Sequence, residues 1–270
     1  MTAADENGSS LAYFSPFFEA VEERVGDGFV IPLPDPAPGS VQARDEAPLG
    51  PWRGSTLIRQ SYNAGVSHGQ ALCRMISVAA HVDPNSPWTL LRGCLENFTT
   101  ASWLMAGTLD ERRSRTLGLW AEDMRNRGMH EDTGKLPRPV PPGKSGYERR
   151  AEIQQLAQRL GLPKIPKPTT NETVKAGARG ADIDPDQALA AWQVASGFAH
   201  GRYWPVMRAS EPRAARHMEG GYMVAFVIDD QQIEPVATLC LNLLNQVVDR
   251  YIDRCLGPDA VHDGRRTAGS

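Results

Sequence analysis

The chain has 270 residues, of which 41% are hydrophobic and 23% charged, as is usual for a soluble globular protein. Its formal net charge of -3 excludes a bulk electrostatic attraction to nucleic acid, although a local basic patch remains compatible with it. No apolar run approaches the roughly 20 residues that a transmembrane helix needs, so we expect no membrane partner.

The N-terminal part of the chain predicts a short helix followed by an extended strap. Ser15-Pro16 is a typical helix start, and Phe17, Phe18 and Val21 give the helix one apolar side before it ends near Gly26. Residues 31–51 are rich in proline and favour an irregular strap. We therefore divide the chain into an N-terminal extension (1–51), a helical-bundle domain (52–258) and a disordered tail (259–270).

The bundle domain contains several long segments with apolar residues at helical spacing. The first runs from about Ser55 to His81, and the turn Asp83-Pro84-Asn85 joins it to a central helix over 86–105. The stripe of the central helix consists of Trp88, Leu91, Leu95, Phe98 and Ser102. Further helices are predicted over 110–128, 147–160, 184–201 and 233–256. The expected fold is mainly α, a helical bundle of long antiparallel helices.

One segment near the C-terminus has two interpretations. Residues 213–229 favour a small β-hairpin, with Glu219-Gly220-Gly221 as its turn and residues 222–228 as its second strand. A buried continuation of the helices is the alternative.

Cys73, Cys94, Cys240 and Cys255 are the four cysteines, and none belongs to a Cys-x-x-Cys pair. All lie in predicted helices, where a buried free thiol is the ordinary state. The first residues of the chain are polar and acidic, unlike a signal peptide. We therefore expect a cytoplasmic protein without disulfides.

Polar residues on the inner faces of four predicted helices are the candidate functional groups. They are His68, the pair Arg92 and Glu96, Arg113 and His200. If these helices pack together, the groups would converge in a pocket that binds a phosphate or nucleotide, with His200 as acid or base. The alternative is a structural network in which Arg92 pairs with Glu96 and each histidine bonds to a backbone carbonyl.

The chain lacks the motifs of several enzyme classes. Glu-x-x-His and His-Glu-x-x-His are absent, which argues against a metal site built from His68, Glu96 and His200. A Walker loop, Gly-x-Gly-x-x-Gly and Gly-x-Ser-x-Gly are absent as well. We expect neither a metal nor a cofactor. His200 is followed by Arg202, Arg208, Arg213 and Arg216, which would form a basic rim beside it. A solvated charged face is the alternative.

The segment Ala195–Tyr203 resembles the tail of a motif of HEPN-like (higher eukaryotes and prokaryotes nucleotide-binding) helical domains, and the match covers Ala199-His200-Gly201 and Tyr203. In that superfamily a helix carries an Arg, four to six residues and then a His, often followed by Gly and an aromatic residue. Here Ser196 and Gly197 stand where the Arg belongs. The resemblance implies an all-α domain that often dimerises and that acts on RNA or nucleotides, in some members as a metal-independent ribonuclease.

The leading hypothesis is therefore an RNA- or nucleotide-binding module, with hydrolysis as an extension. His200, Arg92 and Glu96 are the candidate catalytic residues. The candidate substrate-binding residues are Arg113, His68, Ser196, Arg202 and Tyr203. The alternative hypothesis is a non-catalytic interaction or dimerisation module in which the same residues are structural. We also expect a homodimer, because the small residues around Ala64 and the wide apolar stripe of 233–256 exceed the needs of one neighbouring helix.

Overall fold

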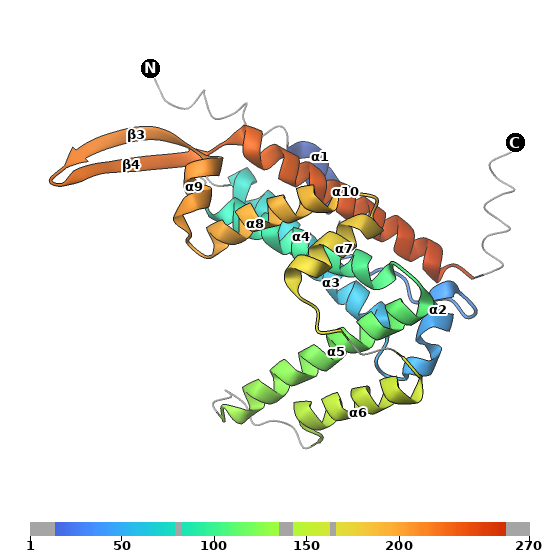
Figure 1. Ribbon diagram of the computed structural model, residues 1–270. Coiled ribbons are helices and arrows are strands. Elements are labelled where there is room, and N and C mark those ends of the chain that lie inside the picture. Colours follow the sequence, from blue (N-terminus) through green and yellow to red (C-terminus); the bar gives the residue numbers. More distant parts are fainter. Residues whose placement is uncertain (1–13, 79–82, 135–142, 163–165, 258–270) are drawn as a thin grey trace, which may run out of the picture.

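The computed structural model describes residues 14–78, 83–134, 143–162 and 166–257. These residues form a mainly α fold with one longer β-hairpin, which confirms the fold class predicted from the sequence (Figure 1). The predicted tail 259–270 lies outside the described residues. The helices around the main core are α3 (Gly54–Val78), α4 (Ser86–Met105), α7 (Thr170–Gly180), α8 (Pro185–Ala199) and α10 (Asp230–Cys255).

The central helix α4 is covered by α3, α7, α8 and α10. Its predicted stripe forms the centre of the core, because Trp88, Leu91, Leu95 and Phe98 are each at most 1% exposed. The Asp83 carboxylate accepts hydrogen bonds from the backbone N–H groups of Asn85 and Ser86, each at 2.9 Å. These bonds satisfy N–H donors that would otherwise lack a partner at the start of the helix.

Glycines let neighbouring helices approach α4 closely. A Cβ atom on Gly65 of α3 would lie 2.3 Å from Cε1 of Phe98. A Cβ atom on Gly177 of α7 would lie 2.1 Å from the carbonyl oxygen of Thr99. At Gly65, which belongs to the small-residue face around Ala64, the neighbour is therefore a helix of the same chain.

The N-terminal segment packs on this core. It contains α1 (Ser15–Glu22), a two-stranded ribbon of β1 (Val25–Gly26) and β2 (Phe29–Val30), α2 (Val41–Glu46) and a 3-10 turn, Ala47–Leu49. Phe17 and Val21 are buried against Gly69 of α3. The hydroxyl of Tyr251 on α10 donates to the carbonyl of Pro34 at 3.1 Å. The proline-rich strap is thus tied to α10.

A buried carboxylate joins α2 to α5 (Leu109–Asp132) and α10. Asp45 is 8% exposed and accepts two hydrogen bonds from Arg112, from Nε at 2.6 Å and from Nη2 at 3.1 Å. Nη2 of Arg254 donates to the same carboxylate, and Nε of Arg254 donates to Gln42 at 3.1 Å. A charge this deeply buried needs such partners to offset its lost hydration.

A second, smaller core lies between α5 (Leu109–Asp132) and α6 (Gly146–Arg159), which run side by side away from the main body (Figure 1). It consists of Leu49, Trp52, Leu117, Ala121, Met124, Ile153 and Ala157. The bounds of both helices lie within a few residues of the predicted ones.

The predicted hairpin is confirmed. It consists of β3 (Ser210–Met218) and β4 (Gly221–Ile228), which pair antiparallel with Met218 opposite Gly221. Its first strand starts three residues earlier than predicted and follows a short helix, α9 (Tyr203–Ala209). Gly220 in the turn has a φ of +88°, a conformation that only glycine adopts without strain.

Gly65→Ala tests the close contact between α3 and α4. Replacing a helical glycine with alanine ordinarily stabilises a helix by about 1 kcal/mol. Here the added methyl group would collide with Phe98, so we expect a loss of about 1–3 kcal/mol, as in other overpacked cores. Urea denaturation of the unmodified protein and of Gly65→Ala measures this change in the free energy of unfolding. Asn63→Ala, on the exposed side of α3, is the control. A stabilised Gly65→Ala protein would contradict the packing.

Candidate functional site

Three of the predicted site residues lie together on α3 and α4. Nε of Arg92 donates to Oε1 of Glu96 at 2.8 Å. The ring of His68 lies over Gly93, where an added Cβ would be 2.5 Å from Cδ2 of the histidine. The structure therefore brings His68, Arg92 and Glu96 together. These are three of the residues that we expect to converge in one pocket.

Glu96 also links α4 to α8. Its Oε1 accepts a hydrogen bond from Nε1 of Trp192 at 2.7 Å, in addition to the bond from Arg92. The side chains of Arg92 and Glu96 are 26% and 29% exposed, so both are mostly withdrawn from water. The pair thus neutralises its own charge and fastens two helices, which matches the structural interpretation of these residues.

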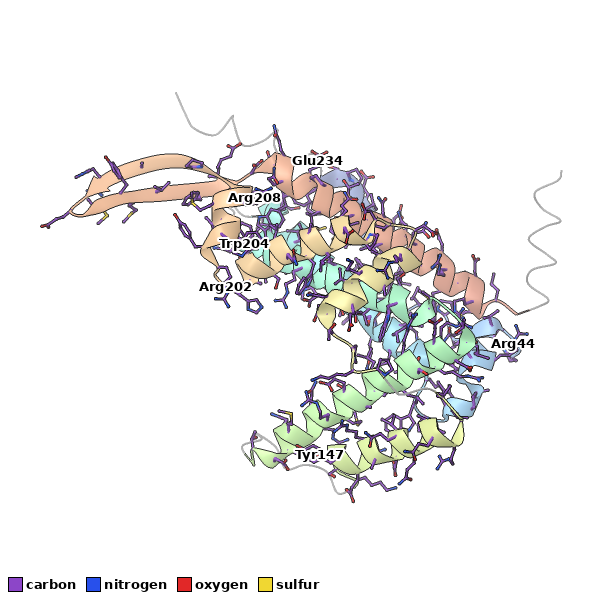
Figure 2. All side chains as sticks on the ribbon, viewed as in Figure 1. Arg44, Tyr147, Arg202, Trp204, Arg208 and Glu234 are labelled. Atoms are coloured by element: carbon purple, nitrogen blue, oxygen red, sulfur yellow. The ribbon has the colours of Figure 1, made fainter. Side chains whose placement is uncertain are left out.

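Arg113 does not belong to this cluster. Its Nε donates to the carbonyl of Asp45 at 2.9 Å, and its Nη2 donates to the carbonyl of Arg44 at 3.1 Å. Figure 2 shows Arg44 at the opposite end of the molecule from Arg202 and Trp204. The expectation that Arg113 converges with His200 is wrong, because Arg113 satisfies the last carbonyls of α2 instead.

His200 is exposed, so the prediction that it points inward is wrong. The physical reason is that α8 ends at Ala199, one residue before His200. The backbone N–H of His200 still bonds to the carbonyl of Ser196 at 3.1 Å, but Gly201 then turns the chain with a φ of +61°. Ser196, one turn earlier, faces the core and is 9% exposed.

The chain after α8 forms an exposed corner, which we call the α9 corner: His200, Arg202, Tyr203, Trp204 and Arg208. The side chains of Tyr203 and Trp204 are strongly exposed for aromatic residues, at 73% and 48%. Figure 2 shows Arg202, Trp204 and Arg208 along α9, beside the start of the hairpin. An exposed group of large aromatic residues usually marks a binding surface.

Two contacts in the core fix the position of this corner. The ring of Phe198 stacks on Trp88 of α4, with centroids 5.1 Å apart and planes inclined by 6°. Pro205 of α9 packs on Gly197, where a Cβ atom would lie 2.5 Å from Cγ of the proline. The last turn of α8 and the first turn of α9 are therefore held against the bundle, while the residues between them face outward.

The corner is locally basic although the chain is acidic overall. Residues 200–208 contain two arginines and a histidine but no carboxylate, and the first acidic residue after them is Glu211. Within the described residues, no ion pair involves Arg202 or Arg208. The sequence indicates every member of the corner except Trp204, for which it offers no signal beyond the neighbouring Arg202 and Tyr203.

A larger concentration of arginine lies in a pocket of about 610 Å³ between α5, α7 and α10. Its charged lining residues are Arg112, Arg115, Arg179, Arg250, Arg254, Asp182 and Asp253.

Most of these arginines serve the protein itself. Arg112 and Arg254 pair with Asp45, and Arg250 lies 3.5 Å from Asp182. Nη1 of Arg115 donates to the carbonyls of Trp103 and Ala106 at the end of α4, at 3.0 and 2.7 Å. These contacts engage four of the five arginines of the pocket within the protein itself.

The described residues contain no group of three or more His, Cys, Asp and Glu side chains that would hold a metal ion. All four cysteines are free and buried, as predicted. None of the described helices is long and apolar enough to cross a bilayer.

Comparison with protein-family models, curated protein sequences and solved structures found no match to this chain. The HEPN-like resemblance of residues 199–203 therefore stays a prediction.

Glu96→Ala tests the structural role of the Arg92–Glu96 pair. The change removes two hydrogen bonds and leaves a half-buried guanidinium without its carboxylate, so we expect a loss of about 1.5–3 kcal/mol. Glu23→Ala is the matched control, because Glu23 is 74% exposed in its pair with Arg24 and such pairs contribute at most about 1 kcal/mol. Equal, small losses in the two variants would contradict this role.

The stability of the protein should also depend on the protonation of His68. Burial lowers the pKa of His68 below its ordinary value of 6.5, and the nearby Glu96 opposes this shift only in part. Because the unfolded chain then binds the proton more readily, the free energy of unfolding should fall as the pH drops below 6.5.

In His68→Gln this part of the pH dependence should disappear. The measurement compares urea denaturation at several pH values from neutral to mildly acidic, with His130→Gln as control for the loss of an exposed histidine. An unchanged pH dependence in His68→Gln would contradict the assignment.

Proposed function

We propose that the protein binds single-stranded RNA through the α9 corner. The observation that carries this proposal is the exposure of Tyr203 and Trp204, at 73% and 48%, between Arg202 and Arg208. Aromatic faces stack on bases, and arginines contact the phosphates between them. This combination is typical of surfaces that bind single strands with little sequence preference.

The charge distribution supports a local contact rather than a wide one. The chain carries a net charge of -3, so long-range attraction to nucleic acid is weak. Residues 200–208 contain Arg202 and Arg208 but no carboxylate, and neither arginine forms an ion pair within the part of the chain that the structure describes. A short strand of a few nucleotides therefore fits this surface better than a long duplex.

In this proposal the RNA makes no direct contact with four of the candidate residues, namely His68, Arg92, Glu96 and Arg113. Glu96 and Trp192 hold α8, and α8 carries the corner. Ser196 is buried and serves packing. His200 is the one candidate catalytic residue that reaches the solvent beside the aromatic rings, so hydrolysis would depend on it.

Anisotropy of a fluorescent ten-nucleotide RNA tests the proposal. Trp204→Ala should weaken binding about 5- to 150-fold, which corresponds to the roughly 1–3 kcal/mol of one stacked base. Trp204→Phe keeps an aromatic face and should retain most of the affinity. Arg202→Ala should weaken binding and reduce its salt dependence, because one phosphate contact is lost.

Arg44→Ala is the matched control, since Arg44 is also exposed but lies at the far end of the molecule (Figure 2). Its affinity should equal that of the unmodified protein. Absence of binding to the unmodified protein at micromolar concentrations, or equal effects of Arg44→Ala and Arg202→Ala, would contradict the proposal. RNA cleavage in the presence of EDTA that is lost in His200→Ala would extend it to a metal-independent ribonuclease.

A further inference from the structure

The β3–β4 hairpin exposes apolar side chains on both of its faces. It projects from the helical body beyond α9 (Figure 1). Tyr222 and Met223, which are neighbours on β4 and point to opposite faces, are 72% and 58% exposed. Met218 and Val224 are 47% and 36% exposed. A two-stranded hairpin without a covering layer is only marginally stable in water, so these faces and edges favour a partner.

The two edges of the hairpin differ in their protection against further strand pairing. The β3 edge carries Pro212, which has no backbone N–H, and the charged Arg216. Proline and charge are the devices by which monomeric proteins block an edge strand. The β4 edge, Gly221–Ile228, has neither a proline nor a charged residue. Only β4 is therefore open to strand addition.

We propose that β4 pairs antiparallel with β4 of a second copy of this chain, so that two hairpins form one four-stranded sheet. An antiparallel pair of identical strands satisfies a two-fold axis, the usual symmetry of homodimers. The uncharged β4 meets itself without repulsion between like charges. Because the hairpin extends beyond the helices, the two bodies stay apart when the strands join (Figure 1).

The dimer contact at β4 differs from the one expected from the sequence, which lies on α3 and α10. Gly65 of α3 packs on Phe98, and Leu243 of α10 is buried in the core, so both positions are occupied within the chain. The dimer contact is also independent of RNA binding, because it concerns β4 and not the α9 corner.

Light scattering after size exclusion tests the contact. At about 50 μM, a concentration at which micromolar dimers persist, the protein should have twice its chain mass of 29.5 kDa. Val224→Lys places two like charges near the centre of the joined strands and should yield the monomer. Val224→Thr keeps a β-branched neutral side chain and should remain dimeric. An equimolar mixture of Val224→Lys and Val224→Glu should recover the dimer.

Disulfide trapping then tests the register. The native cysteines are all buried, so a single cysteine introduced on β4 is the accessible thiol of the chain. Cysteines placed one at a time at 223, 224, 225 and 226 should give an oxidised dimer with a sharp maximum near the two-fold axis. Gln155→Cys on the exposed side of α6 should give none.

A monomeric unmodified protein, a dimer unaffected by Val224→Lys, or a dimer without a cross-link from β4 would each overturn the proposal. Circular dichroism of every variant shows whether the helices are intact, since Ile228 is the described hairpin residue that packs against the main core and is unchanged in all of them. Trp204→Ala should leave the mass unchanged, so a failure of RNA binding and a failure of dimerisation are distinguishable.

Discussion

The packing of α8 on α4 is the contact on which the candidate site depends. Phe198 stacks on Trp88 at one end of α8, and Trp192 donates to Glu96 nearer the other end. Between them, Gly197 gives Pro205 of α9 room to approach. These contacts determine where α8 ends and which way the chain leaves it. The exposure of Tyr203 and Trp204 is a consequence of this geometry.

Arginines of the described residues differ in what accepts their hydrogen bonds. Arg92, Arg112 and Arg254 pair with the carboxylates of Glu96 and Asp45, while Arg113 and Arg115 donate to carbonyls at helix ends. These interactions stabilise the bundle where backbone or carboxylate groups would otherwise be buried alone. Arg202 and Arg208 are exposed and belong to no such contact among the described residues, so they remain free to bind a ligand.

The sequence predicts the long helices well and the short ones poorly, for a physical reason. α4 and α10 repeat large apolar residues over many turns, and this pattern identifies a buried helical face directly. α7 was not predicted, because Thr170–Gly180 contains Val174 as its one large apolar residue. It packs through glycine instead, with Gly177 against the backbone of Thr99. Such close contacts depend on the neighbouring helix and leave little periodic pattern in the sequence.

Helical spacing gives the face of a residue but not the exact end of its helix. His68, Arg92 and Glu96 lie well inside α3 and α4, so helical spacing predicts the face of each of them directly. The same spacing predicts an inward His200 only if α8 continues by one more residue, but α8 ends at Ala199 and the chain then turns outward. The partner of Arg113 is the backbone of α2, a segment whose position no periodic pattern indicates.

The central claim is that RNA contacts the α9 corner, and photochemical cross-linking tests it most directly. A short single strand that carries 4-thiouridine would be irradiated with the unmodified protein, and the linked peptides would be identified by mass spectrometry. The account predicts cross-links within residues 200–208, on Tyr203 or Trp204. Cross-links confined to the arginine-lined pocket around Arg115 and Arg179 would contradict it.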